Sequence, residues 1–203
     1  MDDEESSVNK YFESVEYMNK KQEYINWLYD DVQQNRKIID ENDSQLARRN
    51  YLRSLFALYE LLLVNLRETT AKLLVDEFSL RGEWNFHELY PLMDETARLS
   101  ENGQLKLEYS RLPFLSLLIY TLRIYAKHVG YSNDFLTDYR WNSFRDSVKI
   151  RHRITHPKFL DDIDIGNDEL TTIATGLAWW NDTLRKLRKA HYLKLVGHEN
   201  IDQ

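Results

Sequence analysis

The sequence predicts an all-α fold, and three observations lead to this prediction. Long stretches of the chain repeat apolar residues every three or four positions, which is the spacing of one face of an α-helix. Only six glycines and three prolines occur in 203 residues, so long loops and many tight turns are not expected. We find no strand pattern and no internal repeat. The length fits one domain with an appended segment.

Two long helices are expected in the first part of the chain. In residues 9–41, apolar side chains recur at helical spacings on an otherwise charged helix. This helix either faces the core, which we favour, or pairs with a helix of another protein. The segment "ENDS" (41–44) supplies capping residues, and a leucine-rich helix over 45–79 follows, with Gly82 expected at its end.

A shorter helix is expected over 85–98, followed by a turn in "SENGQ" (100–104). The next helix should open near Pro113, a residue tolerated in a first helical turn, and stop at Gly130. Because this helix is apolar nearly all round, we expect it to be central.

The last two helices carry the candidate site. One is predicted over 134–154 and the other from Asn167, as N-cap, to about 195. Asp168 and Glu169 fall in the first turn of the last helix, where the helix dipole favours negative charge. An acidic loop, "DDIDIGND" (161–168), connects the two.

Composition and charge exclude several classes of protein. The chain has no cysteine, so it forms no disulfide, no thiolate metal site and no cysteine nucleophile. The first residues, "MDDEES", are unlike a secretory signal, and the longest apolar segment, 112–126, is too short to span a membrane and contains Arg123. We expect a cytoplasmic protein without membrane association. The net charge of −6 excludes a nucleic-acid binder that uses its whole surface, but it leaves room for a local basic patch.

The segment "RHRITHPK" (151–158) holds the candidate catalytic residues. Proline disfavours α-helical backbone in the residue before it, so His156 should lie at or just beyond the end of its helix. Arg151 lies five positions earlier, and a step of five rotates a helix by about 140°. The two side chains therefore converge only if the helix unwinds at Pro157 or if a second subunit supplies the same pair.

Arg151 has an unusual place on its helix. Trp141, Phe144 and Val148 form an apolar stripe that Arg151 continues, so its guanidinium should be partly buried. A buried charge needs a partner, so Arg151 either meets a carboxylate inside the fold or lines a cleft that receives an anion.

A histidine and an arginine together could cleave RNA without a metal ion. The 2′-hydroxyl of RNA can attack the adjacent phosphate when a group near neutral pH moves its proton, and histidine is suited to this. Arginine can stabilise the negative charge that grows on the phosphate oxygens. Two such pairs, one from each subunit, would supply a base and an acid.

Basic residues surround this motif. Residues 145–158 contain a single acid, Asp146, and these cations: Arg145, Lys149, Arg151, Arg153 and Lys158. They form a candidate RNA-binding patch, or else a solvated helix end whose cations complement the helix dipole. A second basic cluster lies at 185–194, and there we favour the solvated helix end.

Other combinations of residues were weighed against this site. His152 and His156 have a helical metal-ligand spacing, and Asp161, Asp162 and Asp164 could add oxygen ligands. Since Pro157 disturbs the helix and no third ligand has a diagnostic spacing, we expect no metal and no cofactor.

Two further features favour a structural interpretation. A second Arg-x4-His pair, Arg123 and His128, is interpreted as a packed helix end. Trp179 and Trp180 are adjacent and should face different directions. One is expected in the core, and the other either at a dimer interface or as a base-stacking surface, with core or interface favoured.

The segment "RHRITHPK" resembles the R-x4-H signature of HEPN domains, and "LARRNYLRSLFALYELLL" (46–63) resembles the first long helix of bacterial HEPN-like proteins. The tandem tryptophans of the last helix fit as well. The resemblance implies a HEPN-like helical domain over 45–197, with residues 1–44 as a helical extension. Carried over by position, it implies that Arg151 and His156 are catalytic and that His152 occupies the polar position after the arginine.

The resemblance also implies an activity and a biological setting. HEPN proteins are often dimers with the motif at the dimer cleft, and many are metal-independent endoribonucleases of phage-defence or toxin–antitoxin systems. We therefore expect an RNA substrate, a homodimer, and an antitoxin or other protein partner bound through the N-terminal helix. The alternative is a non-catalytic helical module that binds RNA or protein, and a weaker third possibility is a binder of small nucleotides.

Overall fold

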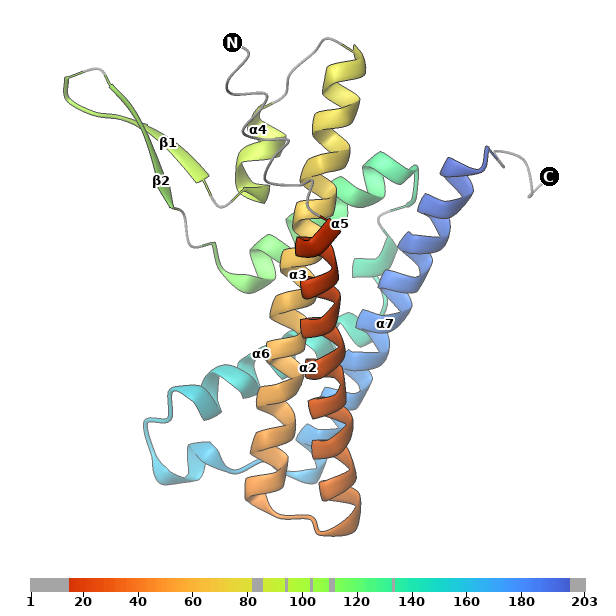
Figure 1. The fold of residues 1–203 in the computed structure, drawn as a ribbon. Coiled ribbons are helices and arrows are strands. Elements are labelled where there is room, and N and C mark those ends of the chain that lie inside the picture. The colour runs from red at the N-terminus through yellow and green to blue at the C-terminus, as the bar shows by residue number, and fades with distance from the viewer. Residues whose placement is uncertain are drawn as a thin grey trace. The chain divides into compact units, whose positions relative to one another are not determined.

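Helices dominate the structure, which confirms the prediction of an all-α fold (Figure 1). The computed structural model describes residues 15–81, 86–93, 95–102, 104–109, 112–132 and 134–197. The helices are α2 (Val15–Glu41), α3 (Gln45–Arg81), α4 (Phe86–Leu89), α5 (Phe114–Val129), α6 (Arg140–Thr155) and α7 (Asn167–Leu195). None of these described helices combines the length and the apolar character needed to cross a bilayer.

The chain divides into two compact units, Met1–Leu63 and Val64–Gln203. The boundary between the two units falls inside α3. Part of the predicted first helix, residues 9–14, and Gly82, the predicted end of the second, lie outside the described residues.

The first unit contains a helical hairpin made of α2 and the first half of α3. Ser44 caps α3, because its hydroxyl accepts the backbone N–H of Ala47 at 3.2 Å, as the segment "ENDS" predicts. Along the hairpin the amide of Asn35 lies 3.3 Å from the hydroxyl of Ser54. The guanidinium of Arg36 lies 6.0 Å from the centre of the Tyr51 ring, which is within range of a cation–π contact.

The second unit departs from the predicted helix over 85–98. Helix α4 ends at Leu89, and a 3₁₀ turn at Tyr90–Leu92 contains Pro91, which cannot supply a backbone donor to a continuing helix. Strand β1 (Glu95–Leu99) then pairs antiparallel with β2 (Leu105–Tyr109). The predicted turn is confirmed between them, where Ser100 N–H donates to the carbonyl of Gln104 at 2.9 Å. The helical prediction is therefore wrong over 95–98, which lie in β1.

Helix α5 is central to the second unit, as predicted. Pro113 precedes its first turn, and Gly130 ends it with φ of 71°, a left-handed conformation that glycine adopts without strain. Its Ile124 lies in a buried cluster with Ala71, Leu74 and Phe78 of α3. Leu89 and Leu92 complete this cluster from α4 and the turn that follows it.

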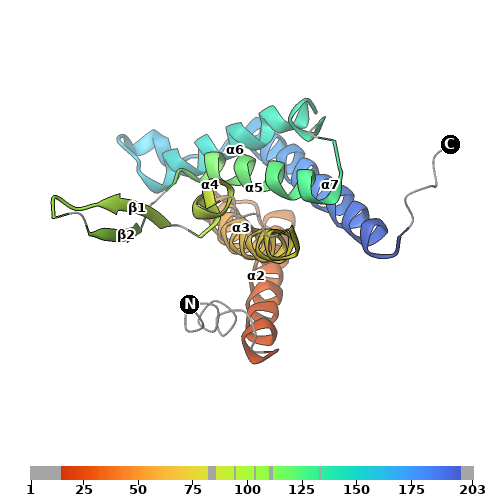
Figure 2. The same ribbon diagram turned by 90° about the horizontal axis from the view of Figure 1, so that it is seen from above.

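Helices α6 and α7 pack against each other and cross (Figures 1 and 2). Phe144 of α6 stacks on Trp180 with 5.5 Å between ring centroids, and it lies 4.9 Å from the ring of Trp179. Gly176 permits this close approach, because a Cβ there would lie 2.8 Å from the Cα of Phe144. The aromatic side chains and the missing Cβ fix the position of the helix that carries the motif.

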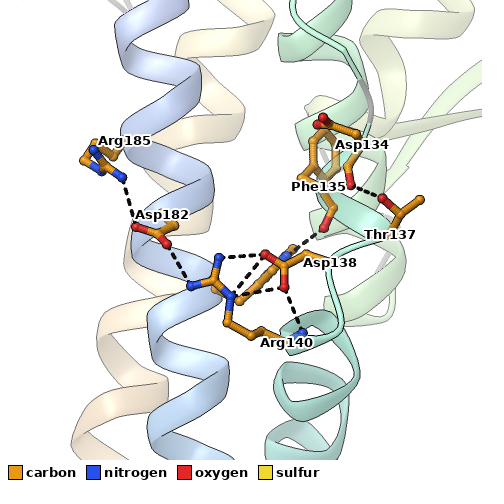
Figure 3. Close-up of polar contacts among 8 residues, drawn as sticks. Asp134, Phe135, Thr137, Asp138, Arg140, Asp182 and Arg185 are labelled. Carbon is orange, nitrogen blue, oxygen red and sulfur yellow. Dashed lines mark hydrogen bonds and ion pairs between the residues drawn. The ribbon is translucent and has the colours of Figure 1, made fainter.

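A cluster of charged side chains fixes the N-terminal end of α6 (Figure 3). Arg140 donates to both carboxylate oxygens of Asp138 and, at 2.7 Å, to Asp182 of α7. The Arg140 guanidinium lowers the pKa of both carboxyl groups. Helix α6 begins only at Arg140, after a 3₁₀ turn at Asp134–Leu136, so the predicted start at 134 is too early.

Candidate functional site

His156 is the first residue beyond α6, as the following proline predicts. Its backbone has φ of −126° and ψ of 60°, outside the helical region, while its N–H still donates to the carbonyl of His152 at 3.0 Å. The imidazole of His156 is exposed to solvent. The end of α6 therefore presents His156 outside the rigid helix but anchored to its last turn.

The structure places the ring of His152 beside that of His156. Their centroids are 5.0 Å apart and the ring planes are tilted by 55°, and both side chains are exposed. The sequence pairs His156 chiefly with Arg151 and predicts an assisting role for His152. The geometry brings these two imidazoles together at the end of α6.

Arg151 is half-buried, as its place on the apolar stripe predicts. Trp141 and Phe144 on that stripe are buried, and Val148, one turn before Arg151, is half-buried. The hydroxyl of Thr155 donates to the backbone carbonyl of Arg151 at 2.7 Å, within the last turns of α6.

The loop after the motif is held by a carboxylate. Both backbone N–H groups of Lys158 and Phe159 donate to one oxygen of Asp162, at 2.8 and 2.9 Å, and these bonds lower the pKa of the Asp162 carboxyl. A 3₁₀ helix, Leu160–Ile163, forms where the sequence predicted only an acidic loop. At the start of α7 the N-cap is Gly166, and the predicted cap, Asn167, is the first helical residue.

Arg153 joins the two ends of this loop. It donates at 2.9 Å to the backbone carbonyls of Asp162 and of Asp164, and it forms an ion pair at 2.7 Å with Glu169 of α7. The sequence placed Arg153 on a polar face as a candidate RNA contact. With three internal partners, its guanidinium has a clear structural use.

The other cations of the candidate RNA-binding patch lie at the surface. Arg145 donates to the side chain of Asn142 at 2.7 Å, and Lys149 pairs with Asp146 at 2.7 Å. Exposed pairs of this kind contribute at most about 1 kcal/mol, so both side chains can exchange these partners for a phosphate. The side chain of Lys158 is exposed two residues after His156.

The aromatic side chains at the surface differ from those predicted. Trp179 and Trp180 are 1% and 2% exposed, so both lie in the core, which was part of the favoured alternative, and neither offers a base-stacking surface. The indole N–H of Trp179 donates to the carbonyl of Phe135 at 2.8 Å, which satisfies its one polar atom. The exposed apolar residues near the motif are Phe159 and Leu160, at 75% and 83%, and the sequence argument did not single them out.

The second Arg-x4-His pair lies in a different environment. The Nδ1 of His128 is 2.8 Å from a carboxylate oxygen of Glu77, and Arg123 is exposed on α5. The His191 ring packs edge-on to that of His128 with 6.4 Å between centroids, and its Nδ1 lies 2.7 Å from the hydroxyl of Tyr125. These contacts agree with a packed helix end.

Within the ranges that the structure describes, no group of three histidine, aspartate or glutamate side chains is placed to hold a metal ion. Comparisons with protein-family models, with curated proteins and with solved structures found no match to this chain.

Proposed function

We propose that this protein is a metal-independent endoribonuclease of the HEPN type. The observation that carries the proposal is the end of α6, where Pro157 frees an exposed His156 from the helix beside His152. The half-buried Arg151 precedes them on the same helix. This is the residue set of the R-x4-H signature that the sequence resembles.

The reaction needs two proton transfers and a fixed positive charge. A 2′-hydroxyl gives its proton to the His156 imidazole as its oxygen attacks the adjacent phosphorus. The bond from phosphorus to the 5′-oxygen breaks, and that oxygen takes a proton from the His156 of a second copy, whose ring starts the reaction as the protonated imidazolium and ends it neutral. Arg151 stabilises the charge on the phosphate oxygens, and His152 assists by hydrogen bonding to the phosphate or to His156. The products are a 2′,3′-cyclic phosphate and a 5′-hydroxyl end.

The proposed substrate is RNA bound along the surface cations Arg145, Lys149 and Lys158. The proposed assembly is a homodimer that brings two copies of the motif together, in a cytoplasmic phage-defence or toxin–antitoxin system. The setting and the dimer follow from the HEPN resemblance of residues 46–63 and 151–158, and the two proton transfers described above are the chemical reason for a second copy.

The test is cleavage of total RNA and of tRNA by the purified protein in EDTA. Wild type should cleave, and His156→Ala should not, while both give the same circular dichroism spectrum and melting temperature. His87→Ala is a matched control, because His87 is an exposed histidine on α4, far along the chain from the motif. Equal cleavage by wild type and His156→Ala would contradict the mechanism.

A second candidate function is supported by α2. Among the side chains that the structure describes in this helix, the exposed large apolar ones are Tyr24, Trp27, Tyr29 and Ile38, and Trp27 is 61% exposed. The rings of Tyr24 and Trp27 pack edge-on, 5.5 Å apart. Exposed aromatic residues of this kind are typical of protein-binding surfaces. A non-catalytic module that binds a protein through α2 predicts no cleavage in EDTA and loss of complex formation in Trp27→Ser.

A further inference from the structure

We infer that Phe159 is a base-stacking residue that makes the site prefer single-stranded RNA. The inference rests on the proposed ribonuclease function and specifies its substrate. Phe159 follows His156 by three residues, and its side chain is 75% exposed.

The backbone around Phe159 is fixed. Its N–H and that of Lys158 are both held by the carboxylate of Asp162. Arg153 holds the carbonyls of Asp162 and Asp164, and Asp164 N–H donates to the carbonyl of Asp161 at 3.2 Å. The ring is thus presented by an ordered loop, and binding to it does not require that the loop first become ordered.

The surroundings of Phe159 suit a nucleic acid more than a protein. Lys158 precedes the ring, and His152 and His156 lie at the nearby end of α6, all of them exposed. Asp162 and Arg153 are occupied in the loop, while Asp161 and Asp164 are the acids that remain nearby. Cations that bind the backbone together with an aromatic side chain that stacks on a base are the combination found in single-strand binding sites.

Stacking on Phe159 selects against double-stranded RNA. In a duplex both faces of a base are covered by its neighbours, whereas an unpaired base can leave the stack and lie on an aromatic ring. An unpaired nucleotide is also free to rotate, so its 2′-oxygen can reach the line of attack on phosphorus. The same contact therefore provides both selectivity and positioning.

Tyr139 provides a matched control. It is 77% exposed, like Phe159, but it lies at the N-terminal end of α6, at the opposite end from His156. If any exposed ring of this unit were enough for binding, Tyr139 and Phe159 would be equivalent. The inference requires that they differ.

The test measures binding of a short single-stranded RNA whose 2′-hydroxyls are methylated, which prevents cleavage. Fluorescence anisotropy should show that Phe159→Leu weakens binding roughly 5- to 150-fold, the usual effect of losing one stacked base. Phe159→Trp should bind as wild type, because it keeps an aromatic face. Tyr139→Leu should also bind as wild type, and Phe159→Leu should leave binding of a blunt RNA duplex unchanged.

Three results would overturn the inference. One is equal single-strand affinity of wild type and Phe159→Leu, and another is an equal loss in Tyr139→Leu. The third is a change in the molar mass of Phe159→Leu in sedimentation without RNA, which would assign Phe159 to an interface between copies of this chain. Failure of the proposed function would give a different result. A wild type that binds the methylated RNA through Phe159 but cleaves no RNA would support the stacking role of Phe159 and contradict the proposed ribonuclease mechanism.

Discussion

Arg153 and Glu169 hold the last turns of α6 against the first turn of α7, because one guanidinium nitrogen donates to both carboxylate oxygens at 2.7 and 2.8 Å. The same carboxylate accepts the N–H of Gly166 at 3.1 Å, so it also caps α7. The other terminal nitrogen of Arg153 reaches two loop carbonyls. A single arginine therefore ties the last turns of α6 to the C-terminal part of the loop that carries His156 and Phe159.

Loss of Arg153 should loosen this loop. In Arg153→Met the carbonyls of Asp162 and Asp164 lose their donor, and the free energy of unfolding should fall by about 1–2 kcal/mol. Hydrogen exchange measured by mass spectrometry should become faster over residues 156–166. Lys149→Met, which removes an exposed cation of the same helix, should leave that exchange unchanged. Wild-type exchange rates in Arg153→Met would show that the loop is held by other contacts.

Lys158 and Arg153 should differ in the salt dependence of RNA binding. Lys158 is exposed, so in Lys158→Ala the slope of log affinity against log salt should become shallower by about 1, the effect of losing one phosphate contact. Arg153→Met should weaken binding through the loop and leave the slope unchanged. Titrations at several salt concentrations measure both. A shallower slope in Arg153→Met would instead make Arg153 a phosphate contact.

The helices were predictable where the local signal is strong. Pro113 and Gly130 bound α5 within one residue, and Pro157 ends α6 where expected, because these residues act on the backbone locally. The hairpin over Glu95–Leu99 and Leu105–Tyr109 was missed, since its strands are short and the helical pattern before Pro91 was extended across it. A proline inside a predicted helix was the signal that could have corrected this.

The candidate site was predictable only in part. The position of His156 follows from its neighbour in sequence, and the half-burial of Arg151 follows from the helical stripe. The partners of Arg153 could not be predicted from the sequence, because Glu169 lies sixteen residues away and is brought close only by the packing of α6 on α7. The same packing buries Trp179 and Trp180 together, although adjacent residues on a helix point in different directions.

Gly176 should be intolerant of any side chain. A Cβ at this position would lie 2.8 Å from the Cα and 3.0 Å from the backbone nitrogen of Phe144, and backbone atoms cannot move aside as a side chain can. Gly176→Ala should therefore lower the free energy of unfolding by about 1–3 kcal/mol, measured by urea denaturation. Gly166→Ala is the control, because nothing lies within 4 Å of its Cβ position. Equal midpoints for the two variants would contradict the close packing of α6 on α7.

The charged cluster at Arg140 should make stability depend on acid. The folded protein holds the pKa of Asp138 and of Asp182 below the ordinary 3.8, chiefly because Arg140 donates hydrogen bonds to their carboxylates. A lowered pKa in the folded state stabilises the protein above about pH 4, and this stabilisation is lost as the pH falls further. Arg140→Met should be less stable at neutral pH and should lose less stability between about pH 4 and 2. Parallel curves of unfolding free energy against pH for the two proteins would exclude this role.

His191 should make stability depend on pH in a different range. Burial, then the nearby His128 and Lys194, lowers the pKa of His191 below the ordinary 6.5, while its Nδ1 lies 2.7 Å from the hydroxyl of Tyr125. Arg188 of α7 is the other cation near Tyr125, and Glu77 of α3 faces His128. The unfolded chain binds a proton on His191 at a higher pH than the folded chain does, so the free energy of unfolding should fall as the pH drops below about 6.5. The side chain in His191→Gln cannot take up this proton. Urea denaturation from about pH 7.5 to 5 should therefore show that the free energy of unfolding depends less on pH in His191→Gln than in wild type. The control His87→Gln should match wild type. An equally steep fall in His191→Gln would assign the proton uptake to another group.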